Sequence, residues 1–178
     1  MADDPGKMTM EAEFLAFSAD KLTQLMGRIE TCVVKLTPEQ IWARGAESQN
    51  AVGNLLLHLN GNLSQWMLSG VGGQPYARDR DGEFSARDAA APSELLTRLR
   101  ATVDAAAALI RAIPHERLTQ RLSIQGYDVS VMGAIYHVVE HFSGHAFQIF
   151  LLTKMFTGED LGFYAHLNSE KTRTSPQP

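Results

Sequence analysis

Apolar residues recur at three- and four-residue steps along four long stretches of the chain. This spacing is typical of amphipathic helices that bury one face. The stretches cover about residues 10–36, 50–69, 92–114 and 131–156, and prolines or glycines stand near their ends. The pattern predicts an all-α protein, and the economical arrangement is a four-helix bundle in which each apolar stripe faces the other three.

The segments between the predicted helices differ in character. A long charged loop, GGQPYARDRDGEFSARD (72–88), joins the second helix to the third, and long loops often carry function. The segment RLTQRLSIQGYDVS (117–130) alternates weakly, which predicts a short extended excursion. We therefore expect one domain over residues 10–165, flanked by disordered polar segments at 1–9 and 166–178.

Composition narrows the functional classes. The 178 residues are 44% hydrophobic and 20% charged, as in ordinary soluble domains. A net charge of −4 gives no electrostatic reason to expect a nucleic acid or an anionic membrane as partner. Cys32, the only cysteine, excludes a disulfide framework and a thiolate metal cage. The polar start lacks the apolar run of a signal peptide and no stretch is long enough to span a bilayer, so we expect a cytoplasmic protein.

The clearest candidate chemistry is a run of histidines in YHVVEHFSGHAFQI (136–149). Two histidines four residues apart on a helix can aim both rings at one ion, and the pairs 137/141 and 141/145 qualify. On a helical wheel His145 lies about 80° from the centre of the apolar stripe and His141 about 40° further round, so the second pair lies closer to the interior. In the second predicted helix, His58 lies at the edge of a leucine-rich stripe and could face them. Hydrogen-bonded core histidines are the alternative, and spacing alone leaves both interpretations open.

Four motifs carry a resemblance to a known family. NLLLHLNGNLSQW, RDRDGEF, HVVEHFSGHAFQI and a closing K-x-F-T-G-E-D-L-G-F-Y together resemble the DinB-like (YfiT-like) metalloenzyme family, within which the chain is similar to a branch of unestablished function. The resemblance spans about residues 10–165. It implies an up-up-down-down four-helix bundle, often a homodimer, that binds divalent nickel or zinc through His58, His141 and His145. The chain departs from the family at Phe147, which replaces a glycine and bears on local packing or the dimer contact.

The sequence HVVEH also fits an inverted zinc-protease motif with Glu140 as the base. That assignment would use His137 and His141 and leave His145 without a role. It would also require an acidic ligand downstream, where little chain remains, so we disfavour it. We expect Glu140 to be solvated or to pair with a neighbouring helix, and His137 to support the ligands or line the rim of the pocket.

Several polar residues are candidates for supporting roles. Asn54 and Asn62 flank His58 by one turn and Gln148 follows His145, so all three could hydrogen-bond to ligands or a bound molecule, or lie on helix surfaces. Arg78 and Arg80 could bind the carboxylate or phosphate of a substrate. Because acidic residues in the same loop nearly balance their charge, we favour ion pairs within the loop, with the following phenylalanine packed into the core.

Characterised relatives in the superfamily include thiol-dependent isomerases and transferases that act with low-molecular-weight thiols. The resemblance therefore suggests a metal-dependent enzyme of the thiol S-transferase or hydrolase kind, acting on a small molecule. Two alternatives stay open: a non-catalytic metal-binding or interaction module, and a dimeric bundle that binds a small organic ligand without a metal.

Overall fold

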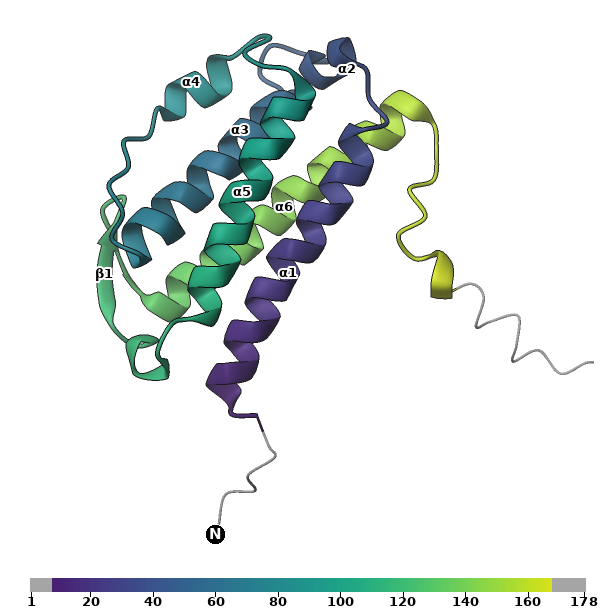
Figure 1. Cartoon of the computed structure of the whole chain (residues 1–178). Coiled ribbons are helices and arrows are strands. Elements are labelled where there is room, and N and C mark those ends of the chain that lie inside the picture. Colours follow the sequence, from purple (N-terminus) through teal and green to yellow (C-terminus); the bar gives the residue numbers. More distant parts are fainter. Residues whose placement is uncertain (1–7, 168–178) are drawn as a thin grey trace, which may run out of the picture.

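The computed structural model describes residues 8–167, most of which lie in helices (Figure 1). Four long helices dominate: α1 (Met10–Val33), α3 (Val52–Leu63), α5 (Pro92–Arg111) and α6 (Val131–Thr157). A π-helix, η1 (Ser64–Val71), continues α3. The shorter elements are α2 (Pro38–Trp42), α4 (Arg80–Ser85), the 3₁₀-helix η2 (His115–Arg117) and the strands β1 (Arg121–Ile124) and β2 (Tyr127–Ser130). The mostly helical prediction is confirmed.

The helix ends follow from local chemistry. The Thr9 hydroxyl accepts a hydrogen bond from the Ala12 amide at the start of α1, and the Ser130 hydroxyl accepts one from the Gly133 amide at the start of α6. α6 ends at Gly158, whose φ of 68° suits a residue without a side chain. Of the terminal segments expected to be disordered, only 8–9 and 166–167 lie within the described residues, and Thr9 belongs to the helix cap.

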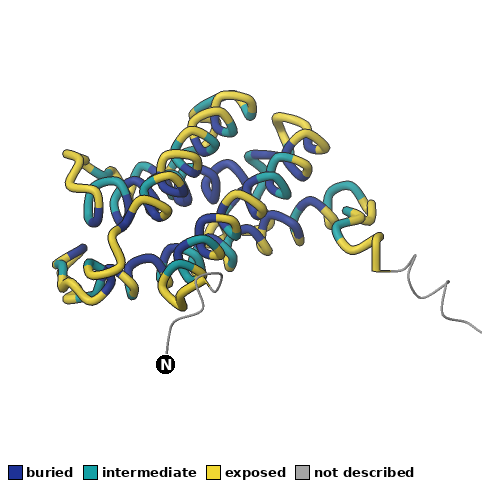
Figure 2. The backbone as a smooth tube through the Cα atoms, turned by 60° about the horizontal axis from the view of Figure 1, so that its bottom comes forward, coloured by how far each residue is buried: buried dark blue, intermediate teal, exposed yellow. Residues whose placement is uncertain are grey.

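The core lies between the four long helices. α1 packs against α5 and α6, and α3 packs against the same two helices. Buried positions line the sides of the helices that face one another, whereas exposed positions lie outside (Figure 2). The core includes Leu22, Met26, Leu55, Leu99 and Phe142, all at most 1% exposed. Burial of these apolar stripes stabilises the helices by removing their side chains from water.

The order of helix directions differs from the expected up-up-down-down arrangement. Arg111 at the end of α5 pairs with Asp20 in the middle of α1, and Lys35 just after α1 pairs with Glu159 just after α6. α1 and α6 therefore run in one direction, and α3 and α5 in the other (Figure 1). The reason lies in the connections. The long segment 72–91 returns along α3, so α5 starts where α3 starts, and the hairpin then reverses the chain into α6.

Two connections bring side chains to the same end of the molecule. The charged loop contains α4, which packs against α3, and Asp79 caps α4 by accepting a hydrogen bond from the Gly82 amide. The expected extended excursion is an antiparallel hairpin whose two-residue turn has φ of 52° at Gln125 and 80° at Gly126, as a type I′ turn requires. The hairpin packs against η1. Among the described residues, no helix is both long and apolar enough to cross a membrane.

Candidate metal centre

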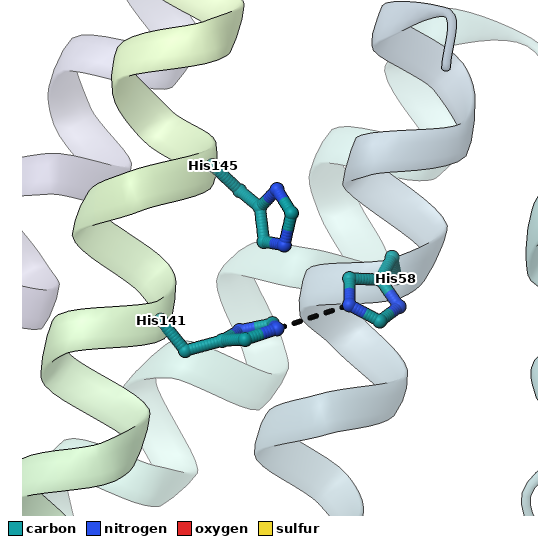
Figure 3. Close-up of side chains that lie close together, drawn as sticks. All are labelled: His58, His141 and His145. Atoms are coloured by element: carbon teal, nitrogen blue, oxygen red, sulfur yellow. Dashed lines mark hydrogen bonds between the residues drawn. The ribbon is translucent and has the colours of Figure 1, made fainter. Parts of the chain in front are cut away.

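Three histidines from two helices converge in the space between α3 and α6. Ring nitrogens of His58, His141 and His145 all lie within 4.8 Å of one another. The Nε2 atoms of His58 and His141 are 3.0 Å apart, and the three rings point toward one another (Figure 3). One helical turn separates His141 from His145, so both rings leave the same side of α6.

His58 is oriented from behind by a carboxylate. Its Nδ1 lies 2.9 Å from Oε2 of Glu83, and a carboxylate can only accept, so Nδ1 carries the proton and donates. The Arg78 Nη2 atom is also 3.1 Å from Nδ1, but it donates instead to the same Glu83 oxygen, 2.7 Å away. This tautomer leaves Nε2 with a free lone pair directed at His141.

Glu83 and Arg78 form an ion pair in the protein interior. Arg78 donates from Nε to Oε1 of Glu83 over 2.7 Å, and the two side chains are only 5% and 9% exposed. Burial raises the pKa of Glu83, but hydrogen bonds from Arg78 and His58 outweigh it and hold that pKa below its usual value. Arg78 Nη1 donates to Gln65 Oε1 over 3.0 Å. The favoured prediction of ion pairs within the charged loop is thus met at Arg78.

A glycine in α3 makes room for this ion pair. A Cβ atom at Gly61 would lie 1.9 Å from Oε1 of Glu83 and 3.0 Å from Nε of Arg78. Gly61 is one turn beyond His58, so the carboxylate reaches the histidine across bare helix backbone.

His141 and His145 are held more loosely. Burial, followed by the neighbouring His145 and His58, lowers the pKa of His141 to about 3. Burial also lowers the pKa of His145, against a hydrogen bond from its Nδ1 to Gln148 Oε1 at 2.8 Å. The Nδ1 atom of His141 is buried and finds no hydrogen-bond partner among residues 8–167. Both rings are therefore neutral near pH 7, the state in which imidazole binds a metal.

This donor set fits a divalent cation. Three neutral imidazoles, one of them with its far nitrogen bound to a carboxylate, are a common ligand set for zinc and related ions. Two Nε2 atoms 3.0 Å apart can form only one hydrogen bond between them, which uses the lone pair of one ring alone. A shared cation would use both lone pairs at once.

A cavity of about 450 Å³ opens beside the histidines. His58 and His141 line it together with Trp66 from η1 and Tyr127 from the hairpin. His137 also lines the cavity, where its ring stacks on Trp66 with centroids 4.0 Å apart. The volume falls in the range typical of small-molecule sites.

The other predicted residues fall into two groups. His137, Asn62 and both arginines line the cavity, and Gln148 contacts His145. Asn54 lies away from the histidine rings: its Nδ2 donates to the backbone carbonyls of Glu83 and Ala86, at 2.9 and 3.0 Å, and so fastens α4 to α3.

Glu140 is exposed and stands outside the histidine cluster. Among the described residues, the cluster that could hold a metal contains His145 and omits His137. This is the arrangement expected from the resemblance, and the opposite of the one that the inverted protease motif requires.

Sequence reasoning missed the role of Glu83. It lies 25 residues from His58, and helical periodicity says nothing about contacts between a loop and a helix. The signal available was the RDGEF segment itself, in which a single glutamate precedes an aromatic residue. Phe84 is half-buried and packs on His58, with ring centroids 4.6 Å apart.

Comparisons with known proteins support the fold. A family model described as "Protein of unknown function (DUF1572)" matches residues 9–166. Among solved structures, the chain is similar to the "conserved protein of locus from Enterococcus faecalis", with 13% identity and a TM-score of 0.67. The match covers 80% of this chain and 96% of that one. No curated protein matches the sequence.

Proposed function

The chain belongs to the DUF1572 family of proteins of unknown function, and we propose that it is a DinB-like four-helix bundle that binds a divalent metal ion. The ligands are His58, His141 and His145, and imidazole donors suit zinc and nickel alike. The observation that carries the proposal is the meeting of these three rings from two helices within 4.8 Å. The sequence motifs that resemble DinB-like proteins include all three histidines.

The residues around the ligands prepare the site for such an ion. Glu83 keeps the proton of His58 on Nδ1, so that Nε2 is free to coordinate. Burial keeps His141 and His145 unprotonated near pH 7, so no proton needs to leave them when an ion binds. A divalent ion with three neutral ligands and an open position supplies Lewis acidity, lowering the pKa of a bound water or thiol.

We propose that the site catalyses a reaction of the thiol S-transferase or hydrolase kind on a small molecule. The cavity beside His58 and His141 supports this assignment, because it gives a substrate access to the ligand atoms. A catalytic metal site keeps one position open toward such a pocket, whereas a structural site is closed by protein. Low-molecular-weight thiols are the substrates suggested by the resemblance.

Elemental analysis of protein purified without chelators tests the metal site. We expect about one equivalent of zinc or nickel per chain in the wild type and almost none in a His58→Ala/His141→Ala variant. His115→Ala is the matched control, because His115 is exposed at the start of η2, and its loss should leave the metal content unchanged. Equal metal content in the double variant and the wild type would refute the site.

The alternative function is a non-catalytic metal-binding or ligand-binding module. Removal of the ion separates the two: a structural ion contributes directly to folding, so its loss should lower the melting temperature sharply. A catalytic ion in a prepared site should leave most of the stability intact. Thermal unfolding with and without a chelator, followed by circular dichroism, distinguishes these outcomes.

We further propose that the chain forms a homodimer through the outer face of α6. Phe147, Leu151 and Met155 follow one another at four-residue steps and are 52%, 60% and 71% exposed. Such a stripe is costly to leave in water. Phe147, at the position of the family glycine, contributes its ring to this stripe. Leu151→Glu should convert a dimer to a monomer in light scattering; a wild type that is monomeric at all concentrations would refute the dimer.

A further inference from the structure

The cavity beside the histidines has an aromatic wall. The rings of Trp66 and His137 lie 4.0 Å apart at an angle of 37°, and Tyr127 follows with its centroid 6.3 Å from that of Trp66. Trp66 is fixed in place because its Nε1 donates to Gln125 Oε1 over 3.0 Å. The wall is therefore an aromatic surface, held by this hydrogen bond, against which a flat, apolar group can pack.

The two arginines that line the cavity differ in their charge balance. Arg78 is paired with Glu83 through two hydrogen bonds of 2.7 Å, so its charge is compensated. Arg80 is exposed, and its guanidinium carbon lies 4.9 Å from the centroid of the Phe84 ring. No carboxylate of residues 8–167 forms an ion pair with Arg80. The nearby Asp79 carboxylate instead caps α4.

Among the residues that the structure describes, no carboxylate lines the cavity either. The residues around it contribute one uncompensated positive charge, that of Arg80, and a bound divalent ion would add two more. A guanidinium held over an aromatic ring presents its planar N–H groups to a carboxylate in a bidentate geometry. Electrostatics and shape thus favour the same kind of ligand, a flat anion.

We propose that the cavity binds a small planar carboxylate, with its carboxylate on Arg80 and its flat body against Trp66 and His137. The uncharged end then faces His58 and His141. This inference rests on the proposed function, because it names the substrate class of the same site. It assigns Arg80 alone to the anion, since Arg78 is already committed to Glu83.

Benzoate and its neutral isostere benzamide are suitable probes for isothermal titration calorimetry with the full-length protein as purified. We expect benzoate to bind more tightly than benzamide, and Arg80→Gln to weaken benzoate about tenfold or more, as expected for the loss of a charge-assisted hydrogen bond. Benzamide binding should hardly change. Arg80→Lys should restore only part of the affinity, because a lysine lacks the planar fork.

Arg98→Gln is the matched control, since Arg98 is exposed on α5 and pairs with Glu94 one turn away. Equal benzoate affinity in Arg80→Gln and wild type would overturn the proposal, and so would equal affinity of wild type for both probes. Elemental analysis of the same samples keeps this test apart from the metal assignment. If the protein contains no metal but benzoate binding depends on Arg80, only the proposed metal function is refuted. If the protein contains metal but benzoate binding does not depend on Arg80, only the proposed substrate class is refuted.

Discussion

The two sides of the histidine cluster are built differently. On α3, His58 is 5% exposed, and the buried pair of Glu83 and Arg78 fixes its ring from behind. On α6, His145 is bound to the exposed Gln148, and His141 has no partner for Nδ1 among the described residues. The α3 side is therefore set before any ligand arrives, whereas the α6 side relies on helical spacing. Substitution of the residues that contact His58 should therefore weaken the site more than substitution of those that contact His145.

The largest effect is expected for Glu83→Gln. The substitution leaves the buried Arg78 without a compensating charge, and breaking such a pair costs about 3–5 kcal/mol of folding free energy. It should also weaken metal binding about 10- to 100-fold, because His58 loses its carboxylate partner. Urea unfolding and metal titration measure the two effects.

Glu94→Gln is the control for this substitution. Glu94 forms an exposed pair with Arg98, and the two side chains are 59% and 56% accessible, so its loss should change stability by less than about 1 kcal/mol. If both variants were equally stable, the buried pair would not be the anchor that its geometry indicates.

A second substitution tests the space between α3 and Glu83. Gly61→Ala would place a methyl group 1.9 Å from the carboxylate, so we expect a loss of about 1–3 kcal/mol from overpacking and a weaker metal site. Gly144→Ala in α6 meets nothing within 4 Å and should stabilise the helix by up to about 1 kcal/mol. Thermal unfolding of both variants would reveal the contrast, and a stabilised Gly61→Ala would contradict it.

The metal-free protein should lose stability as the pH falls from about 6.5 toward 5. An unfolded histidine takes up a proton near pH 6.5, whereas the pKa of His141 is lowered to about 3 in the folded protein. The unfolded chain therefore binds more protons than the folded protein in this pH range. The contribution of His141 to the free energy of unfolding is fully present only above about pH 6.5. Urea unfolding as a function of pH measures the slope. His141→Asn should make this slope shallower without abolishing it, because the pKa values of His145 and His137 are also lowered. His115→Ala should leave the slope unchanged. A flat wild-type profile would show that His141 protonates freely in the fold.

The smallest effect is expected on the α6 side. Gln148→Ala removes the hydrogen bond to His145, but Gln148 is exposed and water can replace it. We expect metal affinity to fall about two- to threefold, as for a bond worth about 0.5 kcal/mol. A loss as large as that of Glu83→Gln would mean that both sides of the cluster are equally anchored.

Local patterns predicted much of this molecule. Steps of three and four residues located α1, α5 and α6 within a few residues of their ends, and the predicted helix 50–69 covers α3 and most of the π-helix η1. The weak alternation of 117–130 marked the hairpin. Helical wheels brought His141 and His145 to the edge of one stripe and His58 to the edge of another, and the structure places the three rings together.

The remainder depended on contacts between distant segments. The directions of the helices follow from how the segment 72–91 returns along α3, and composition does not specify that course. Asn54 was expected near His58 from its one-turn spacing, but its side chain turns to the backbone of α4. The contact of Glu83 with His58 depends on how that loop packs over α3, which local sequence patterns do not specify.

The π-helix that follows α3 has a consequence for how this cavity can change. A π turn takes about one residue more than an α turn, and here the Gly72 amide reaches back to the Met67 carbonyl. Trp66 lies within this π segment, two residues after its start at Ser64. Deleting Ser64 would rotate the indole by about 100° around the helix while leaving every ligand residue unaltered. Length variation within eight residues, and not replacement of side chains, is thus a simple route by which relatives could reshape what the cavity accepts.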